Sequence, residues 1–170
     1  MNVLVTGGAG YIGSVVVEEL LKNSHDVAVL DNLSTGHRDA VDVRALLIEG
    51  DLKDRQLVEQ TLTENNIEAV IHMAGSSQVA ESVQNPQKYY DNNVVAGKVL
   101  LDAMRAVKVE KIVFSSTAAV YGEAMRQPID ETDKLEPTNP YGKTKLEFEN
   151  ELRRNHEGLL ELLFLRRGMG

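Results

Sequence analysis

The sequence predicts an α/β domain built on a doubly wound parallel sheet, and three observations predict it. Short apolar runs alternate with segments of helical pattern along the chain. The first run, 2–6, passes directly into a glycine-rich turn, 7–13, and a helical segment follows. With 170 residues and 42% hydrophobic content, the chain can bury one core, so a single domain over 1–170 is expected.

The apolar runs and helical segments are expected to form strands and helices in alternation. Asn85-Pro86 and Asn139-Pro140 each offer an N-cap residue and a first-turn proline to a helix. The carboxyl ends of parallel strands meet at one edge of such a sheet, where ligands bind. The expected strands lie near 2–6, 27–30, 44–49, 69–73, 111–115 and 160–165. The expected helices lie near 11–22, 54–65, 86–107 and 141–155.

Composition argues against several classes of function. Eighteen basic and 26 acidic residues give a net charge of −8, which disfavours nucleic-acid binding. The absence of cysteine rules out thiolate metal sites and fits a reducing compartment, so a cytoplasmic protein is expected. No apolar run has the length of a membrane span. The four histidines lack ligand spacing, so no metal site is expected.

The glycine turn predicts a binding site for a dinucleotide. Glycines at 7, 10 and 13 suit a tight turn, close approach of the backbone to a pyrophosphate, and close packing of helix on strand. The N–H groups at the following helix start would face the phosphate charge. A turn of this kind also closes ordinary strand–helix units, so its surroundings decide between the two interpretations.

An acidic residue stands where a dinucleotide site needs one. Asp31 ends the second apolar run, 18 residues beyond Gly13, where a carboxylate would meet the adenosine ribose hydroxyls. A carboxylate there repels a 2′-phosphate, which predicts NAD rather than NADP. The alternative is a turn or helix-cap residue, because Asp31-Asn32 leads into a loop, 34–36.

Three later segments extend the predicted site. Asp51-Leu52 would meet the adenine, and the small residues in 72–75 would let the backbone pass close to a flat ligand, although either segment also suits a plain loop. Residues 91–93, Asp-Asn-Asn, are poor helix formers inside an expected helix. Either a side-chain amide there reaches a buried polar ligand, or the helix is simply exposed.

Tyr141 and Lys145 are four residues apart, so on a helix their side chains share one face. That spacing suits a phenolate base. A tyrosine pKa near 10 must fall by roughly three units, about 4 kcal/mol, and a nearby ammonium with a positive nicotinamide ring favours that fall. Thr117, at the end of a hydroxyl-rich run, would hydrogen-bond the substrate oxygen. The alternative for the pair is helix packing plus a solvated charge.

Together these segments resemble the N-terminal part of the extended short-chain dehydrogenase/reductases, and within them the UDP-glucose 4-epimerase family. The resemblance implies a Rossmann-type domain that binds NAD, with Thr117, Tyr141 and Lys145 catalytic. The stretches that carry it are 3–14, 30–36, 49–52, 70–75, 81–86, 89–94, 114–122 and 140–145. The residues expected to bind the cofactor are Gly7, Gly10, Tyr11, Ile12, Gly13, Asp31, Asn32, Leu33, Ser34, Thr35, Gly36, Asp51, Leu52, Met73, Ala74, Gly75, Ser76, Ser77 and Asn92.

The resemblance implies inversion at C4 of UDP-glucose and UDP-galactose through a 4-keto intermediate, with Tyr141 as base and then acid. Related dehydratases have Asp-Glu where Ala118-Ala119 stands here, which disfavours dehydration. The family's C-terminal substrate domain is expected to be absent from this chain, so the chain alone should be inactive. The alternatives are a non-catalytic NAD-binding module and another nucleotide-sugar reductase or decarboxylase.

The expected partners are a UDP-hexose and a second copy of the chain, without nucleic acid or membrane. The two copies would pair through the helices near 86–107 and 141–155. The residues expected to supply apolar surface for this homodimer are Val94, Val95, Leu100, Leu101 and Met104.

Overall fold

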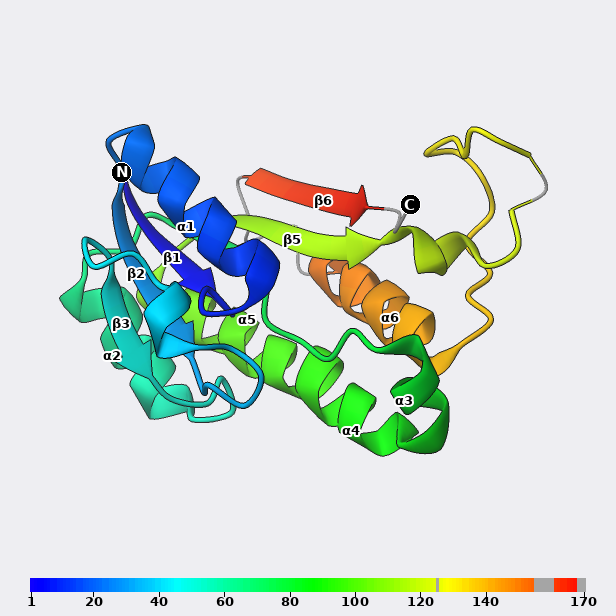
Figure 1. Cartoon of the computed structure of the whole chain (residues 1–170), viewed down its shortest axis with the longest axis horizontal. Helices are drawn as coiled ribbons and strands as arrows, with labels where there is room; N and C mark the ends of the chain where they lie inside the picture. Colours follow the sequence, from blue (N-terminus) through cyan, green and yellow to red (C-terminus); the bar gives the residue numbers. More distant parts are fainter. Residues whose placement is uncertain (125, 155–160, 168–170) are drawn as a thin grey trace.

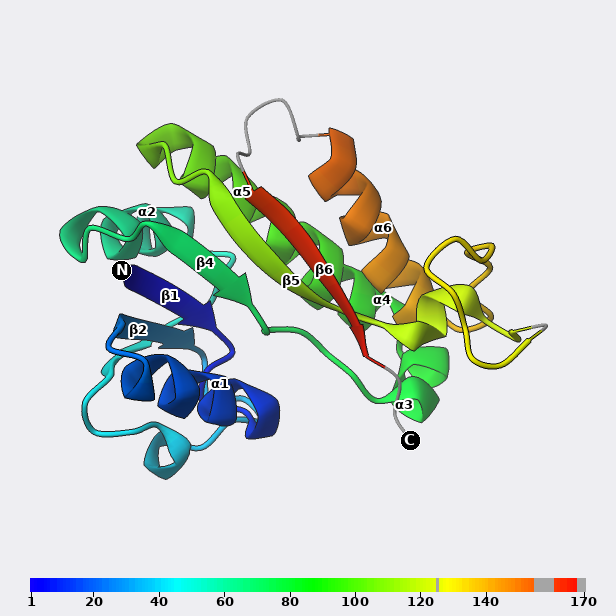
Figure 2. The same cartoon turned by 90° about the horizontal axis from the view of Figure 1, so that it is seen from above.

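The computed structural model describes residues 1–124, 126–154 and 161–167. Within these ranges, six strands form one parallel sheet in the order β3-β2-β1-β4-β5-β6 (Figures 1 and 2). The chain builds outward from β1 to one side and then from β4 to the other, which confirms the predicted doubly wound sheet. The strands are β1 (Asn2–Thr6), β2 (Asp26–Asp31), β3 (Leu46–Glu49), β4 (Ala69–His72), β5 (Lys111–Thr117) and β6 (Glu161–Arg167).

Helices cover both faces of the sheet. Figure 2 shows α1 on one side of the strands and α2, α5 and α6 on the other. None of the helices in the described ranges is long and apolar enough to cross a membrane. The helices are α1 (Tyr11–Lys22), α2 (Arg55–Glu64), α3 (Val79–Gln84), α4 (Pro86–Tyr90), α5 (Ala96–Val107) and α6 (Pro140–Arg154), with short turns η1 (Arg38–Ala40), η2 (Asp91–Val95) and η3 (Ala118–Tyr121).

Each face of the sheet has its own apolar core, because successive strand residues point to opposite sides. Leu4 and Leu30 belong to the larger core, which includes residues of α2, α5 and α6. Val5 and Val29 belong to the smaller core, beneath Val17 of α1. The alternation along β1 and β2 therefore packs both layers of helices onto one sheet.

The predicted helix starts are largely confirmed. Asn139 caps α6, because its side-chain oxygen accepts a hydrogen bond from the Gly142 N–H at 2.8 Å. Asn85 precedes α4 with Pro86 at the first helical position, but its side chain makes no capping bond. Residue 155 of the expected last helix and residue 160 of the expected last strand lie outside the described residues.

Two expected elements differ from the structure. The segment expected as one helix over 86–107 is α4, a π-helical turn η2, and α5, with a further short helix, α3, before it. The strand expected over 44–49 begins only at Leu46, because a turn precedes it in which Asp42 accepts the Arg44 N–H at 2.9 Å.

Most of the apolar residues expected to pair two copies are buried inside the domain. Val94, Leu100 and Met104 are completely buried and Leu101 is 3% exposed, because α5 packs against α2 and η2 packs against α6. Of the five residues named for that surface, only Val95 is exposed, at 36%. The prediction that they form a free apolar patch is therefore wrong.

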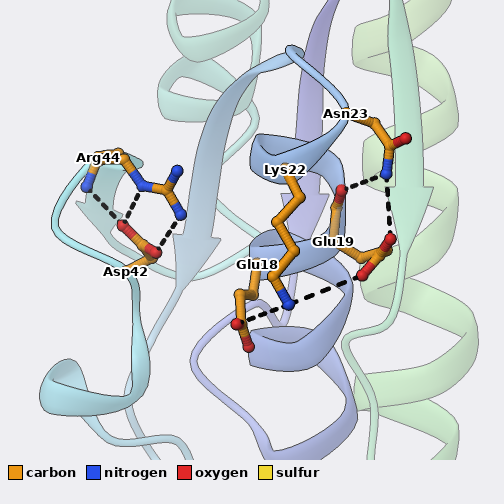
Figure 3. A network of polar contacts seen from close by, with 6 residues as sticks. All are labelled: Glu18, Glu19, Lys22, Asn23, Asp42 and Arg44. Carbon is orange, nitrogen blue, oxygen red and sulfur yellow. Dashed lines mark hydrogen bonds and ion pairs between the residues drawn. The ribbon is translucent and has the colours of Figure 1, made fainter.

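A polar network covers the outer end of α1 (Figure 3). Lys22 pairs with Glu18 at 2.8 Å, and Arg44 pairs with Asp42 at 2.7 Å in the neighbouring loop. Exposed pairs of this kind contribute little stability. This network lies at the end of α1 away from the glycine turn, so it is not part of the site described below.

Candidate functional site

The strands place their carboxyl ends at one edge of the sheet, called here the carboxyl edge. Thr6 at the end of β1 lies in register with Leu30 of β2 on one side and with His72 of β4 on the other. His72 in turn lies in register with Phe114 of β5. The strand order reverses between β1 and β4, which is where open sheets of this kind bind ligands.

The glycine turn lies at this reversal point and has the geometry that its spacing predicts. Gly7 has φ +72°, and a Cβ on it would come within 2.6 Å of the Ala74 backbone nitrogen, beyond β4. A Cβ on Gly13 would come within 2.1 Å of the Gly7 carbonyl oxygen. Gly10 precedes α1 without a side-chain capping bond. The turn therefore presents bare backbone and the start of a helix at the carboxyl edge.

Asp31 ties the end of β2 to the glycine turn. Its carboxylate accepts the Ala9 N–H at 3.0 Å and the Leu33 N–H at 2.9 Å, and the residue is 8% exposed. The alternative interpretation, a turn residue, is thus part of its role. Each carboxylate oxygen can accept a second hydrogen bond, so this arrangement leaves acceptor capacity for a hydroxyl ligand.

The segments after β2 and β3 meet beside Asp31. Asn32 donates to the Asp51 carboxylate at 3.1 Å, and Leu52 is buried. Gly36 lies against Ala9, since a Cβ there would come within 2.9 Å of it. The structure thus brings Asp31, Asn32, Gly36, Asp51 and Leu52, which are expected around the adenosine, together. Five other expected cofactor residues have exposed side chains: Tyr11, Ile12, Ser34, Thr35 and Ser77.

The loop after β4 is held by two asparagines. Asn93 accepts the Ser76 N–H at 2.7 Å and donates both to the Ser76 carbonyl, at 3.0 Å, and to the Thr144 hydroxyl of α6, at 3.1 Å. Asn92 donates to the Ser76 hydroxyl at 3.1 Å. Asn93 is 2% exposed, so a simple exposed helix is the wrong interpretation of 91–93. The Asn93 amide binds this loop and α6.

Thr117, Tyr141 and Lys145 gather where β5 ends against α6. All three side chains are largely buried, at 7%, 9% and 5% exposure. Burial raises the pKa of Tyr141, and hydrogen bonding with the Thr117 hydroxyl opposes that rise in part. Thr117 also accepts the Ala119 N–H at 3.1 Å.

The lowering of the Tyr141 pKa that the four-residue spacing of Tyr141 and Lys145 predicts is not present in this structure. Its ammonium donates to the Ser115 carbonyl at 2.9 Å and lies 4.8 Å from the centre of the Phe114 ring. Burial lowers the pKa of Lys145 to about 8. The pKa of Tyr141 is raised rather than lowered, because desolvation outweighs every other influence on it in this structure.

Three residues that are not among the expected site residues belong to this region. Asn93 could have been found, because it lies in the segment flagged as unsuited to a helix. Phe114 and His72 look like ordinary strand residues in the sequence, and only the packing of β4, β5 and α6 shows that they lie behind Lys145.

Comparisons with known proteins agree with this geometry. The model of the NAD dependent epimerase/dehydratase family matches residues 3–166. Relatives named UDP-glucose 4-epimerase from Lacticaseibacillus casei and Corynebacterium glutamicum are 51% and 53% identical over 149 residues, which is 88% of this chain and 45% of each relative. The chain thus spans about half the length of the curated relatives that it matches.

Solved structures show the same likeness. UDP-glucose 4-epimerase from Brucella ovis, in complex with NAD, aligns with a TM-score of 0.93 and 43% identity over 98% of this chain and 52% of its own. The enzyme from Bifidobacterium longum, in complex with NAD+ and UDP, aligns with a TM-score of 0.93 and 40% identity over the same shares. The family match over nearly the whole chain and these likenesses establish that the chain belongs to the NAD dependent epimerase/dehydratase family.

Proposed function

We propose that residues 1–170 form an NAD-binding domain and that, in a protein as long as its relatives, this domain inverts C4 of a UDP-hexose. One observation carries the proposal. Thr117, Tyr141 and Lys145 gather at the same carboxyl edge at which the glycine turn leaves its backbone bare. A dinucleotide-dependent reaction needs a phosphate-binding turn and proton-transferring side chains close together, and open sheets bring them together where the strand order reverses.

The residues present fit a dinucleotide. A Cβ on Gly75, which has φ +146°, would lie 2.8 Å from the Asn93 oxygen and 3.6 Å from the Lys145 ammonium, so only glycine leaves that space open. The glycine turn and the start of α1 would hold the pyrophosphate, Asp31 the ribose, and the segments at Asp51 the adenine. The NAD-bound relatives support this assignment.

The catalytic residues have distinct roles in the proposed reaction. Bound NAD supplies the hydride acceptor and a positive charge. Tyr141 takes the proton of the sugar hydroxyl and later returns it, while the Thr117 hydroxyl hydrogen-bonds the same oxygen. Tyr141 acts as base only when its pKa falls, because burial raises it in the structure described here. Lys145 does not lower that pKa in the structure described here, so the fall would come only with NAD bound, when the positive nicotinamide ring adds to the charge of the Lys145 ammonium.

A UDP-hexose is the substrate that the relatives' names support. Ala118-Ala119, in η3 directly after Thr117, carry no acid that could expel water from the sugar, which favours epimerisation over dehydration. A homodimer in the cytoplasm completes the proposal, and the absence of cysteine supports the reducing compartment.

Two measurements test the proposal. Calorimetric titration of the 170-residue chain should show NAD binding and much weaker NADP binding, because Asp31 repels a 2′-phosphate. In a protein extended to the length of the relatives, Tyr141→Phe should lower the rate of UDP-glucose and UDP-galactose interconversion by roughly 10²- to 10⁴-fold. Tyr90→Phe, the same change on α4, should leave the rate unchanged.

The outcomes separate the alternatives. Residues 1–170 by themselves should be inactive, because they span about half the length of the relatives and groups that orient the sugar are expected in the rest; loss of orientation is costly in rate. An extended protein that binds NAD but leaves UDP-hexoses unchanged would support the non-catalytic module instead. A chain that binds neither cofactor would overturn the proposal as a whole.

A further inference from the structure

We infer that Phe114 is a positioning residue: the face of its ring, braced by His72 and Phe148, holds the Lys145 ammonium at the end of β5. The inference rests on the proposed function, in which Lys145 acts beside Tyr141. It adds an almost completely buried residue, 1% exposed, that fixes a charge on which the proposed reaction depends.

The surroundings of the Lys145 ammonium carry this inference. Its nitrogen lies 4.8 Å from the Phe114 ring centre and donates to the Ser115 carbonyl at 2.9 Å. The residue is 5% exposed. Within the described part of the chain no carboxylate forms an ion pair with it. A desolvated ammonium over an aromatic face is attracted by the electron-rich ring, more strongly than at an exposed site.

The ring is fixed by its own neighbours. Phe114 stacks on His72, with ring centres 5.5 Å apart and planes at 23°, and packs edge-to-face with Phe148, with ring centres 4.8 Å apart and planes at 77°. His72 and Phe148 also contact each other at 5.3 Å. These three side chains are almost completely buried, so none has room to turn.

The support behind the ring is uncharged. The Thr6 hydroxyl hydrogen-bonds His72 Nδ1 at 2.7 Å. Burial, and then the charge of Lys145, lower the pKa of His72 to about 3. His72 is therefore neutral at physiological pH, and no second positive charge lies behind the ring to oppose the ammonium.

Two other titratable groups belong to the same region of α6. Tyr141 lies one turn before Lys145, and Glu149 lies one turn after it. Glu149 accepts the Ser116 hydroxyl and pairs with Arg153 at 3.0 Å. Burial lowers the pKa of Lys145 to about 8, and an attraction between the ammonium and the ring opposes that lowering.

Fluorination of the ring provides the test, because it weakens the negative face while nearly preserving the shape. Position 114 is replaced by 4-fluoro- and then 3,4,5-trifluorophenylalanine in the 170-residue chain. The pKa of Lys145 is read by ¹³C NMR of labelled lysine, with Lys145→Met assigning the signal. We expect the pKa to fall stepwise, and by about one unit in Phe114→Leu.

The same changes at Phe148 are the matched control. Phe148 belongs to the same cluster, but the ring over which the Lys145 ammonium lies is that of Phe114, so fluorination of Phe148 should leave the Lys145 pKa unchanged. An unchanged pKa in the Phe114 series, or equal shifts in both series, would overturn the inference. The measurement uses neither NAD nor sugar, so its result does not depend on whether the proposed function is correct.

The extended protein provides a second readout. Phe114→Leu should move the alkaline limb of the pH–rate profile down by about one unit, because Lys145 loses its proton earlier. Phe148→Leu removes a similar volume and one neighbour of the ring but leaves the Phe114 ring itself, so it should move that limb clearly less than Phe114→Leu does. If both variants lose rate but neither shifts the alkaline limb of the pH–rate profile, Phe114 only fills space in the core, and its positioning role is contradicted.

Discussion

Asp31 has a structural role as well as its proposed role in cofactor choice. Its carboxylate accepts two backbone N–H groups in a nearly buried setting. Asp31→Asn replaces one acceptor oxygen with a donor, which leaves Ala9 or Leu33 unsatisfied. We expect the free energy of unfolding to fall by about 1–3 kcal/mol in urea titration. The preference for NAD over NADP should also shrink.

The control for this change is Asp39→Asn, on an exposed residue of η1. It should alter neither the unfolding free energy nor cofactor choice. If Asp31→Asn changes stability but leaves the ratio of NAD to NADP affinity as it was, Asp31 is a turn residue only.

His72 predicts how stability depends on pH. Its pKa is about 3 in the folded chain, against about 6.5 when exposed, because burial disfavours the charged ring. The unfolded chain therefore takes up the proton first. The contribution of His72 to stability is complete above pH 6.5 and is lost toward pH 3, by about 1.4 kcal/mol per pH unit.

His72→Asn removes this titration, so its unfolding free energy should fall less than that of the unmodified chain between pH 6.5 and 4.5. His37→Asn, at an exposed histidine, should follow the unmodified chain. Denaturant titrations at several pH values compare the three proteins. Parallel curves for the His72 variant and the unmodified chain would contradict the prediction.

At the scale of elements, the connection between β1 and α1 depends on Gly7. A Cβ there meets the Ala74 backbone at 2.6 Å in a left-handed conformation, whereas a Cβ on Gly10 comes only within 3.3 Å of the Gly7 oxygen. Gly7→Ala should lower the unfolding free energy by about 2–4 kcal/mol, and Gly10→Ala by about 1 kcal/mol. Equal losses would show that the turn adapts.

The elements also show what a sequence can predict. Apolar runs predicted the core strands, and the spacing of glycines predicted the turn, because both depend on residues close in the chain. The π-helical turn η2 could not be predicted. It places Asn93 where it bonds Ser76 and Thr144, 17 and 51 residues away, and no local propensity encodes those contacts.

The same limit applies to the candidate site. Tyr141 and Lys145 were found from their spacing on one helix, but the partners of Lys145 lie on β5. The expected direct effect of Lys145 on the pKa of Tyr141 is missing because α6 turns the ammonium toward Ser115 and Phe114. Whether two residues that share a helix face act on each other depends on what the neighbouring strand offers.

At the scale of the whole molecule, pairing of two copies through 86–107 and α6 stays a prediction with less apolar surface to support it. Val95 is 36% exposed on η2, whereas the other residues named for the interface lie in the core. If this face pairs, Val95→Asp buries a charge and should shift light scattering toward monomer by at least tenfold in dissociation constant. Val43→Asp, at a valine that is 98% exposed in the loop before β3, should leave the dissociation constant unchanged.

Pairing through this face would be contradicted if the unmodified chain scatters light as a monomer at high micromolar concentration. Its circular dichroism spectrum must then still show the folded chain.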